Sequence, residues 1–342
     1  MPILNNMQWS FAQIWNESLE EGKPQKPMQP RDRIWASEVG GSMIDRWLKM
    51  KGAEPSNPPN PRSLRKFEAG NIWECIVGYV LKRAGILLAQ QDWLKYQYEG
   101  LLPVVGKLDF KAGGKPDYDK ASHIISNEFE WLPPFISRAT QKIVDRLKTQ
   151  YPDGLAEIIL ELKSCSSFMY EMYERKQTAS PQHKCQLFHY LKSLHAHEGH
   201  IIYVSKDDAR LLEIGVLNPS SVETDYYNDI KELTGYITSN IQPPLEQPIK
   251  FDNDFGKFSA NWKVGYSSYL TKLYGLKCQK EFDDKYKPIA ERWNRVLSRI
   301  TESKDMTDKN KTALEEMAKA GFNIEEIKTL ISKEAKDETA KA

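Results

Sequence analysis

The chain has 342 residues, which suffices for roughly two domains with a large core. Its 48 Lys and Arg residues and 47 Asp and Glu residues give a net charge of +1, which excludes a generally basic, histone-like binder and leaves room for a local basic groove. No apolar run approaches the roughly 18 residues of a membrane helix, the first residues lack a secretory pattern, and four cysteines are too few for a disulfide scaffold. We therefore predict a reduced, cytoplasmic protein with no membrane partner.

The N-terminal part of the chain predicts two helices separated by loops. Residues 1–30 are expected to be a helical extension, with a peripheral helix near 9–19 and then a polar, Pro-rich connector. Four prolines within 55–61 predict a loop. Ser63 is a suitable N-cap for a helix that ends near Gly85. The apolar stripe of this helix is expected to comprise Ile72, Ile76, Tyr79 and Val80.

The middle of the chain alternates between strands and helices. Residues 88–112 are rich in strand-forming side chains and lead into a Gly-rich turn, and 123–129 is expected to return as another strand. Pro133 opens an amphipathic helix that extends to about Gln150. The apolar segment 157–163 predicts a short strand at the centre of a sheet, covered on both faces.

A further helix and two strands are predicted after this central strand. Ser180, followed by a proline, is a favourable N-cap, and Gly199 is expected to cap the other end of the helix. Strands are expected at 200–205 and 209–217, and helices dominate after about residue 222.

The order of these elements predicts an α/β (α+β) fold with a mixed central sheet and helices on its faces. The main domain is expected to cover 31–300, with its core in 63–217. Residues 301–342 are expected to be a charged, detachable helical tail, whose second helix begins at Asn323 with Glu326 three positions on.

The central strand carries two ionisable residues on one face. Side chains alternate along a strand, so Glu161 and Lys163 point the same way while Leu160 and Leu162 point into the opposite layer. Burying an unpaired charge is costly, so the pair needs a reason. Taken alone, it is explained by a salt bridge at a strand end.

Asp109 argues against that simple explanation. It also ends an apolar strand and precedes a Gly-rich turn. Two carboxylates from adjacent strand ends form a hard-oxygen site suited to Mg²⁺ or Mn²⁺. A lysine beside them can orient a water or offset the charge of a phosphate, so these residues are the parts needed for metal-assisted phosphodiester hydrolysis.

A third element comes from the helix after Ser180. Gln186 and Tyr190 are four residues apart and share one helix face, separate from the leucines of the apolar face. Taken alone, this pattern is that of an ordinary amphipathic helix.

The ordered set Asp109, Glu161-x-Lys163 and Gln186-x-x-x-Tyr190 resembles the PD-(D/E)XK nucleases of the RecB type, which include the CRISPR spacer-acquisition nuclease and many phage exonucleases. The resemblance covers roughly 31–217 and includes three flanking segments. These are Phe67–Glu74, similar to the first helix motif of the family, Gly199–Lys206, similar to the strand after the Gln/Tyr helix, and Arg33–Glu38, similar to its Ser-containing opening motif. The resemblance implies a restriction-endonuclease-like sheet.

Roles follow from the resemblance residue by residue. Lys163 would position the attacking water or stabilise developing charge, and Gln186 and Tyr190 would hold DNA or the lysine. The implied ligands of the metal are Glu74, Asp109, Glu161 and the backbone carbonyl of Leu162.

Gly70 favours Glu74 as the helix ligand. A glycine inside a helix costs about 1 kcal/mol relative to alanine. Four positions before Glu74, it would leave space beside that carboxylate for a metal or a strand. Glu68 competes for the role but lies off this face.

The chain departs from many members of the family in one place. Their iron–sulfur cluster is held by cysteines, whereas the similar aromatic segment here has Val264 and Ser267 at the ligand positions. We therefore predict Mg²⁺ or Mn²⁺ and no iron–sulfur cluster. The absence of a cluster favours a phage-type enzyme.

Contacts to DNA are expected from the serine of the opening motif, as the resemblance implies, and from aromatic residues mixed with basic ones. A packing loop is the alternative for residues 170–176. The zinc interpretation of the histidines at 195, 197 and 200 is disfavoured because the spacing fits no standard motif. The predicted DNA-binding residues are Ser37, Tyr170, Tyr173, Arg175, Lys176, Gln186 and Tyr190.

The sequence thus predicts a metal-dependent DNA exonuclease that acts on single strands or DNA ends in recombination, repair or phage DNA processing, in a bacterial or phage-infected cell. Two alternatives stay open: a nucleic-acid-binding or assembly protein that keeps the fold without turnover, and an RNase. No nucleotide-binding Gly-x-x-x-x-Gly-Lys-[Ser/Thr] loop occurs, so an unwinding partner, such as a helicase, would be another chain. A recombinase partner and a homo-oligomer are compatible with this interpretation.

Overall fold

The computed structural model describes residues 10–21, 27–117, 119, 121, 123, 134–217, 220–252, 256–302 and 308–327. The chain divides into two compact units. Unit 1 comprises residues 1–41, 46–53 and 59–241, and unit 2 comprises residues 42–45, 54–58 and 242–342. Each unit has a hydrophobic core of its own.

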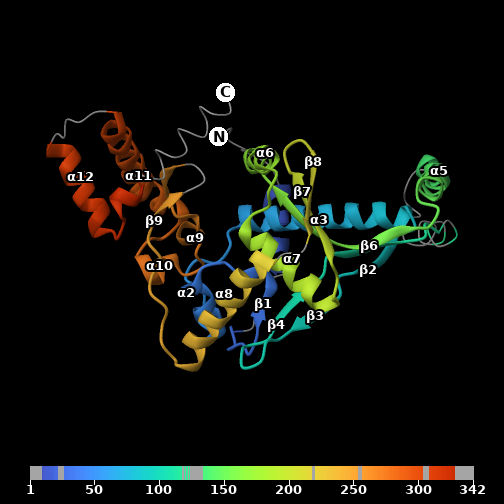
Figure 1. Ribbon diagram of the computed structural model, residues 1–342, viewed down its shortest axis with the longest axis horizontal. Helices are drawn as coiled ribbons and strands as arrows, with labels where there is room; N and C mark the ends of the chain where they lie inside the picture. The colour runs from blue at the N-terminus through green and yellow to red at the C-terminus, as the bar shows by residue number, and fades with distance from the viewer. Residues whose placement is uncertain are drawn as a thin grey trace. The chain divides into compact units, whose positions relative to one another are not determined.

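Five strands of unit 1 form the central sheet, in the order β2-β5-β6-β7-β8 (Figure 1). They are β2 (Leu87–Gln90), β5 (Phe110–Gly114), β6 (Leu155–Cys165), β7 (Glu198–Ser205) and β8 (Leu211–Leu217). The middle strand, β6, pairs antiparallel with β5 and parallel with β7. The sheet is therefore mixed and flanked by helices, which confirms the predicted fold class.

The long helix α3 (Pro61–Arg83) covers one face of this sheet. Its row Trp73, Val77 and Leu81 packs against a core that includes Leu160 and Leu162. The predicted stripe was wrong: Ile72, Ile76 and Val80 are exposed. Two apolar rows run side by side on this helix, and the row with the bulkier Trp73 and Leu81 is the one that faces the sheet. The predicted cap was wrong as well, because Asn60 accepts the hydrogen bond from the Ser63 N–H.

Helix α7 (Pro181–Leu194) contacts β6 and β7, and α8 (Ser220–Thr238) contacts α7. The predicted N-cap is confirmed, since Ser180 Oγ accepts from the His183 N–H. Gly199 does not cap the helix. His195 does so with a left-handed conformation, and Gly199 lies in β7, where a Cβ would be 2.8 Å from Leu187 Cδ1. The glycine therefore permits the close approach of α7 to the sheet.

A second, three-stranded sheet has the order β1-β4-β3. β1 (Ile34–Trp35) pairs parallel with β4 (Val104–Lys107), which pairs antiparallel with β3 (Trp93–Tyr96). The short 3₁₀ helix η1 (Ala36–Glu38) follows β1, and both η1 and β3 contact α7. This sheet thus holds the other side of the helix that carries Gln186 and Tyr190.

Four helices complete the described part of unit 1. They are α1 (Phe11–Glu21), close to the predicted peripheral helix, α2 (Met43–Met50), which begins in unit 2, α5 (Pro134–Gln150), close to the helix predicted after Pro133, and α6 (Ser167–Lys176). The strand predicted at 123–129 lies, except for His123, outside the described residues.

Unit 2 contains a hairpin that was not predicted, followed by helices. The hairpin consists of β9 (Ile249–Asp252) and β10 (Lys257–Ala260), and the helices are α9 (Trp262–Gly265), α10 (Leu270–Tyr274), α11 (Gln279–Glu302) and α12 (Asp308–Lys319). The predicted domain limit at residue 300 lies inside α11.

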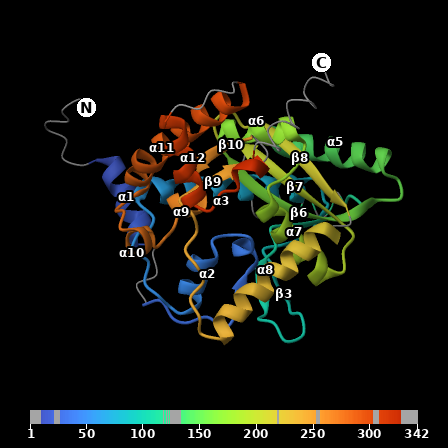
Figure 2. The same ribbon diagram turned by 60° about the vertical axis from the view of Figure 1, so that its left-hand side comes forward.

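The described part of the expected tail is not detached. Ala313, Met317 and Ile327 are buried in one core with Trp293 and Phe258, and α12 packs against α11 (Figure 2). The composition of this segment is dominated by charged residues, so it did not indicate that one side of these helices is apolar. The predicted cap at Asn323 is confirmed, since its Oδ1 accepts from the Glu326 N–H at 3.3 Å. None of the helices in the described ranges is long and apolar enough to span a membrane.

Candidate active site

The middle strand of the central sheet places an ion pair on the face toward α7. Glu161 is fully buried, and its Oε1 lies 2.5 Å from Lys163 Nζ. The lysine also donates a hydrogen bond to Gln186 Oε1 at 2.9 Å. Strand alternation therefore brings the two charged side chains together as predicted, and α7 supplies the next partner.

A chain of hydrogen bonds continues from the lysine to the second sheet. Gln186 Nε2 donates to the Tyr190 hydroxyl at 3.0 Å, and this hydroxyl donates to the Lys107 carbonyl at 2.9 Å. Gln186 and Tyr190 are both buried, and burial raises the pKa of the phenol. The resemblance implies that this pair holds either DNA or the lysine. In this structure Gln186 contacts Lys163 directly, and Tyr190 contacts Gln186.

Gly106 makes this contact between α7 and β4 possible. A Cβ at this position would lie 2.7 Å from Tyr190 Cε1 and 2.8 Å from Ala36 Cβ. Gly106→Ala is expected to destabilise the protein by about 1–3 kcal/mol in urea denaturation, because the neighbours must move. Gly235→Ala in α8 is the matched control, since no atom lies within 4 Å of its Cβ position and alanine is the better helix former. Equal effects of the two substitutions would contradict this account.

Asp109 lies beside the ion pair. Its Oδ2 accepts a hydrogen bond from the Leu162 N–H at 2.8 Å, so the carboxylate is tied to the backbone of β6. Burial raises the pKa of Asp109, an effect that the charge of Lys163 and the Leu162 hydrogen bond oppose. Of the predicted ligands, Asp109 thus directly precedes β5, and Glu161 lies in the neighbouring strand β6.

The carboxylates of this site have buried oxygens without hydrogen-bond donors. Among the described residues, neither Oε atom of Glu161 receives a well-aligned hydrogen bond, so its contact with Lys163 is one of charge, and Glu74 Oε1 has no donor either. Burial raises the pKa of Glu161 to about 8, even though Lys163 opposes the shift. Burial and the charge of Asp109 raise the pKa of Glu74 as well.

These oxygens have the chemistry of ligands for Mg²⁺ or Mn²⁺, hard cations that take carboxylate and carbonyl oxygens. Buried carboxylates without donors fit a cation in that respect. The arrangement is not a complete ligand set, however. Within the described ranges, no three His, Cys, Asp or Glu side chains are placed so that together they could hold a metal ion.

The two carboxylates of α3, Glu68 and Glu74, have different surroundings. Glu68 accepts a hydrogen bond from Trp15 Nε1 at 2.8 Å, so it is engaged elsewhere. Glu74 interacts electrostatically with Asp109 and Lys163. A Cβ at Gly70 would lie 3.3 Å from Ser164 Oγ of β6 and, outside its own helix backbone, within 4 Å of no other described atom. That Gly70 leaves space for a metal or a strand beside Glu74 stays a prediction.

The residues expected to bind DNA are scattered. Tyr170 and Tyr173 are buried, the first donating to the Leu211 carbonyl and the second stacked on Tyr203 with ring centroids 4.1 Å apart. Because both rings are buried, they cannot stack on a base. These two tyrosines match the alternative, in which this segment packs within the protein. Ser37 and Arg175 are exposed, and Lys176 is half-buried.

The histidines serve packing and ion pairing. His183 and His189 hydrogen-bond the hydroxyls of Tyr203 and Tyr226, each at 2.8 Å. His200 bridges Glu198 and Glu213 at 2.8 and 2.5 Å.

The segment compared with the iron–sulfur motif lies in unit 2. Val264 is buried, and Ser267 Oγ donates to Asp45 Oδ1 at 2.7 Å and accepts from the Tyr269 N–H at 3.0 Å. The serine thus joins a polar network in the loop. That the protein carries no cluster remains a prediction.

Lys107 is a site residue that sequence reasoning missed. Its carbonyl anchors Tyr190, and its ammonium charge lowers the pKa values of Glu74 and Asp109 against the effect of burial. The available signal was its position two residues before Asp109.

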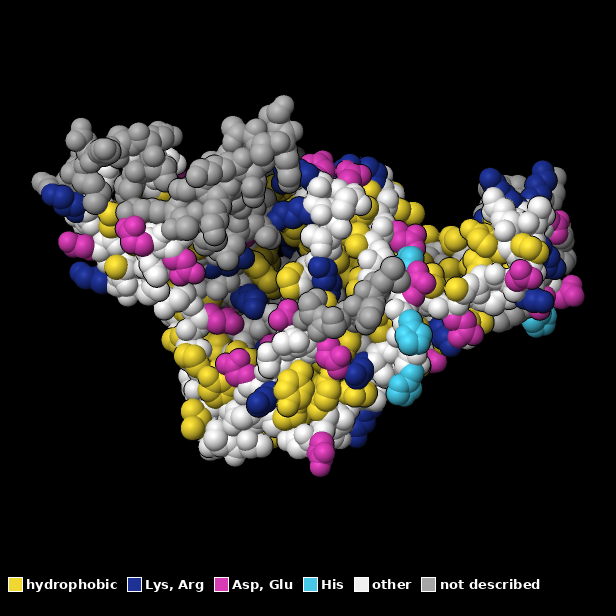
Figure 3. Space-filling model, viewed as in Figure 1, with side chains coloured by type: hydrophobic (Ala, Val, Ile, Leu, Met, Phe, Trp, Pro, Cys, Tyr) yellow, Lys and Arg dark blue, Asp and Glu magenta, His cyan; other side chains and the backbone are white. Residues whose placement is uncertain are grey.

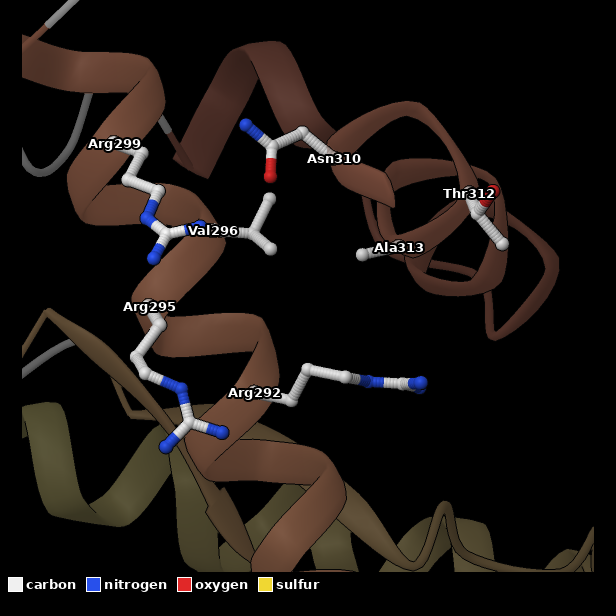
Figure 4. Close-up of a pocket in the computed structure, with 7 residues that line it drawn as sticks. All are labelled: Arg292, Arg295, Val296, Arg299, Asn310, Thr312 and Ala313. Carbon is white, nitrogen blue, oxygen red and sulfur yellow. The ribbon is translucent and has the colours of Figure 1, made fainter. Parts of the chain in front are cut away.

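Unit 2 has a separate cavity of about 390 Å³ between α11 and α12, shown in Figure 4. Its cationic lining contains none of the predicted site residues, and Arg292 there is ion-paired with Glu316. The lining residues are Arg292, Arg295, Val296, Arg299, Asn310, Thr312 and Ala313.

Comparison with known proteins gives distant structural likenesses. No protein-family model matches the chain, and no curated protein matches it. The structure is similar to that of SSO0001, with a TM-score of 0.43 and 14% identity over 78% of this chain and 97% of the other. It is also similar to an alkaline exonuclease, LHK-Exo from Laribacter hongkongensis, with a TM-score of 0.33 and 7% identity over 67% and 94%. LHK-Exo in complex with dAMP gives 0.36 and 8% over 61% and 89%. Likeness at this level does not define a function.

Proposed function

We propose that the protein is a nuclease that hydrolyses phosphodiester bonds of DNA with the help of Mg²⁺ or Mn²⁺, acting as an exonuclease. The observation that carries the proposal is the buried carboxylate of Glu161, without a well-aligned donor and paired with a lysine that Gln186 and Tyr190 hold in place. A buried charge without full compensation is costly, and such strongly shifted groups cluster at functional sites.

Lys163 has the features of a group that handles water or a phosphate oxygen. An ammonium has three N–H donors, of which one points to Gln186 and one faces Glu161. The side chain is 24% exposed, so its third donor can reach a substrate. The Gln186–Tyr190–Lys107 chain fixes the lysine rotamer, which lowers the cost of orienting it in each cycle.

Asp109, Glu161 and the Leu162 carbonyl would hold the divalent ion, with Glu74 as the predicted third carboxylate, although these three side chains do not form a complete ligand group in this structure. When bound, such an ion supplies charge neutralisation at the phosphate and a lowered pKa of water. A bound cation would take the place of the hydrogen-bond donors that the Glu161 carboxylate lacks.

The test is digestion of end-labelled single- and double-stranded DNA with Mg²⁺ or Mn²⁺. Glu161→Gln is expected to lower the rate by at least about 10²-fold, because the amide keeps the shape and loses the charge. The control is Glu157→Gln on the same strand, whose side chain is 59% exposed and paired with Lys111. A fully active Glu161→Gln variant would rule out the proposed site, and the position of the label gives the direction of degradation.

A nucleic-acid-binding protein without turnover is the second candidate. The observation that favours it is the lack of a three-ligand group among the described side chains. Wild-type protein that is inert on linear DNA, circular DNA and RNA with either ion, yet shifts DNA in a gel, would establish this candidate. Cleavage of RNA alone would establish an RNase instead.

A further inference from the structure

The outer face of the β1-β4-β3 sheet gathers two tryptophans and two lysines. Residues directly opposite in neighbouring strands share a face, and Trp93 pairs with Lys107 while Lys95 pairs with Val105. Trp35 pairs with Val105 from the other side. All five side chains therefore lie on one face, and the opposite face turns Gly106 toward Tyr190 of α7.

The tryptophans form an exposed aromatic surface. Trp93 is 61% exposed, and its ring centroid lies 5.3 Å from that of Trp35, with the planes tilted by 51°. Val105, in the strand between them, is buried. An indole this exposed is unusual, because burying it would stabilise the fold. An exposed aromatic surface of this kind fits a ligand that stacks on the ring.

The charges around these rings suit a phosphate backbone. Lys95 and Lys107 are exposed on the same face as Trp93. Arg33, next to Trp35, is ion-paired with Asp32 at 2.6 Å, Asp32 also interacts electrostatically with Lys95, and Asp92, directly before β3, is exposed. The two lysines therefore provide the local positive charge. Figure 3 shows basic and acidic side chains interspersed over the side of the molecule in view, in keeping with a net charge of +1.

Lys107 belongs both to this face and to the candidate active site. It ends β4, its carbonyl accepts the Tyr190 hydrogen bond, and Asp109 follows two residues later. Its ammonium charge lowers the pKa values of Glu74 and Asp109.

We propose that this face, formed by Trp35, Trp93, Lys95 and Lys107, binds single-stranded nucleic acid, with a base stacked on Trp93 and the backbone held by the two lysines. Stacking on an aromatic ring beside basic residues is the general way in which proteins hold single strands without reading their sequence. That the bound nucleic-acid strand runs toward Asp109 depends on the proposed nuclease function. That this face binds a single strand does not depend on it.

The experiment is fluorescence anisotropy of labelled oligothymidylate of about 20 nucleotides, in EDTA so that no cleavage occurs. Trp93→Ala is expected to weaken binding roughly tenfold. The matched control is Trp262→Ala, which removes a tryptophan that is 48% exposed in unit 2 and should leave binding unchanged. Lys107→Gln should weaken binding and reduce its salt dependence, whereas Lys280→Gln, an exposed lysine of α11, should not.

The outcomes separate this proposal from the nuclease proposal. Unchanged binding by Trp93→Ala, or no binding of oligothymidylate by the wild type, would overturn the binding surface even if the protein cleaves DNA. Weakened binding by Trp93→Ala supports it even if the protein cleaves nothing. Glu157→Gln, whose side chain is exposed and paired with Lys111, should bind as the wild type does in EDTA. Oligouridylate serves as the RNA arm, and equal binding is expected if stacking dominates.

Discussion

Replacing Lys163 by methionine is expected to destabilise the protein by an amount that depends on pH. The substitution leaves the fully buried carboxylate of Glu161 without its counter-charge. Breaking a buried pair in this way typically costs about 3 kcal/mol. The pKa of Glu161 is already raised to about 8 by burial, so a folded protein at acidic pH carries it protonated and does not need the lysine. The cost should therefore be small up to about pH 8 and grow as the pH rises above that value.

The sign follows from linkage. A carboxyl group whose folded pKa lies above its unfolded value of 4.5 binds its proton more tightly in the folded state. Its contribution to stability is complete below the unfolded pKa and is lost as pH rises toward the folded pKa. Without Lys163 the folded pKa rises further, so the loss continues to higher pH in the variant. Urea denaturation at several pH values, without divalent ions, measures this.

The double variant Glu161→Gln with Lys163→Met separates charge from packing. It removes the buried charge together with its partner, so it should recover most of the stability and lack the pH dependence that Glu161 contributes. It should still fail to cleave DNA. If Lys163→Met costs the same at every pH and the double variant recovers nothing, the lysine acts through packing and the electrostatic account of the site is wrong.

The parts of the site that sequence could predict depend on local periodicity. The two-residue repeat of a strand places Glu161 and Lys163 together, and the four-residue spacing in a helix does the same for Gln186 and Tyr190. A cap such as Ser180 is equally local. These features need no knowledge of what the element packs against, and the structure contains all of them.

The parts that failed depend on partners remote in sequence. On α3 the spacing allows two apolar rows, and only the shape of the sheet selects Trp73 over Ile72. Tyr170 belongs to a segment of aromatic and basic residues, a composition typical of an exposed binding surface. In the structure its ring is buried, and its hydroxyl donates to the Leu211 carbonyl of β8. The pairing of Trp93 with Lys107 is likewise a matter of register between strands, which their separate sequences do not contain.

Acid is expected to destabilise the protein through two buried histidines. Burial lowers the pKa of His183 to about 3, an effect to which the charge of Lys163 adds, and burial lowers that of His189 to about 4. Each ring is hydrogen-bonded to a tyrosine hydroxyl. A group with a lowered folded pKa contributes stability that is complete above its unfolded value of 6.5 and is lost as pH falls toward the folded value. Each unit of difference corresponds to about 1.4 kcal/mol, so the two together can remove several kcal/mol between about pH 6.5 and pH 4.

His189→Asn isolates one of these two contributions. The slope of unfolding free energy against pH counts the protons taken up on unfolding, so this variant should show about one proton less than the wild type over that range. His197→Asn, an exposed histidine, is the control and should leave the slope unchanged. His200 cannot produce the same loss of stability in acid. Burial lowers its pKa, but hydrogen bonds to Glu198 and Glu213 outweigh burial and raise it. The contribution of His200 to stability is therefore lost as pH rises, not as pH falls. An unchanged slope in His189→Asn would mean that this ring is already protonated in the folded protein, and the hydrogen bond to Tyr226 would then have to use the tyrosine as acceptor.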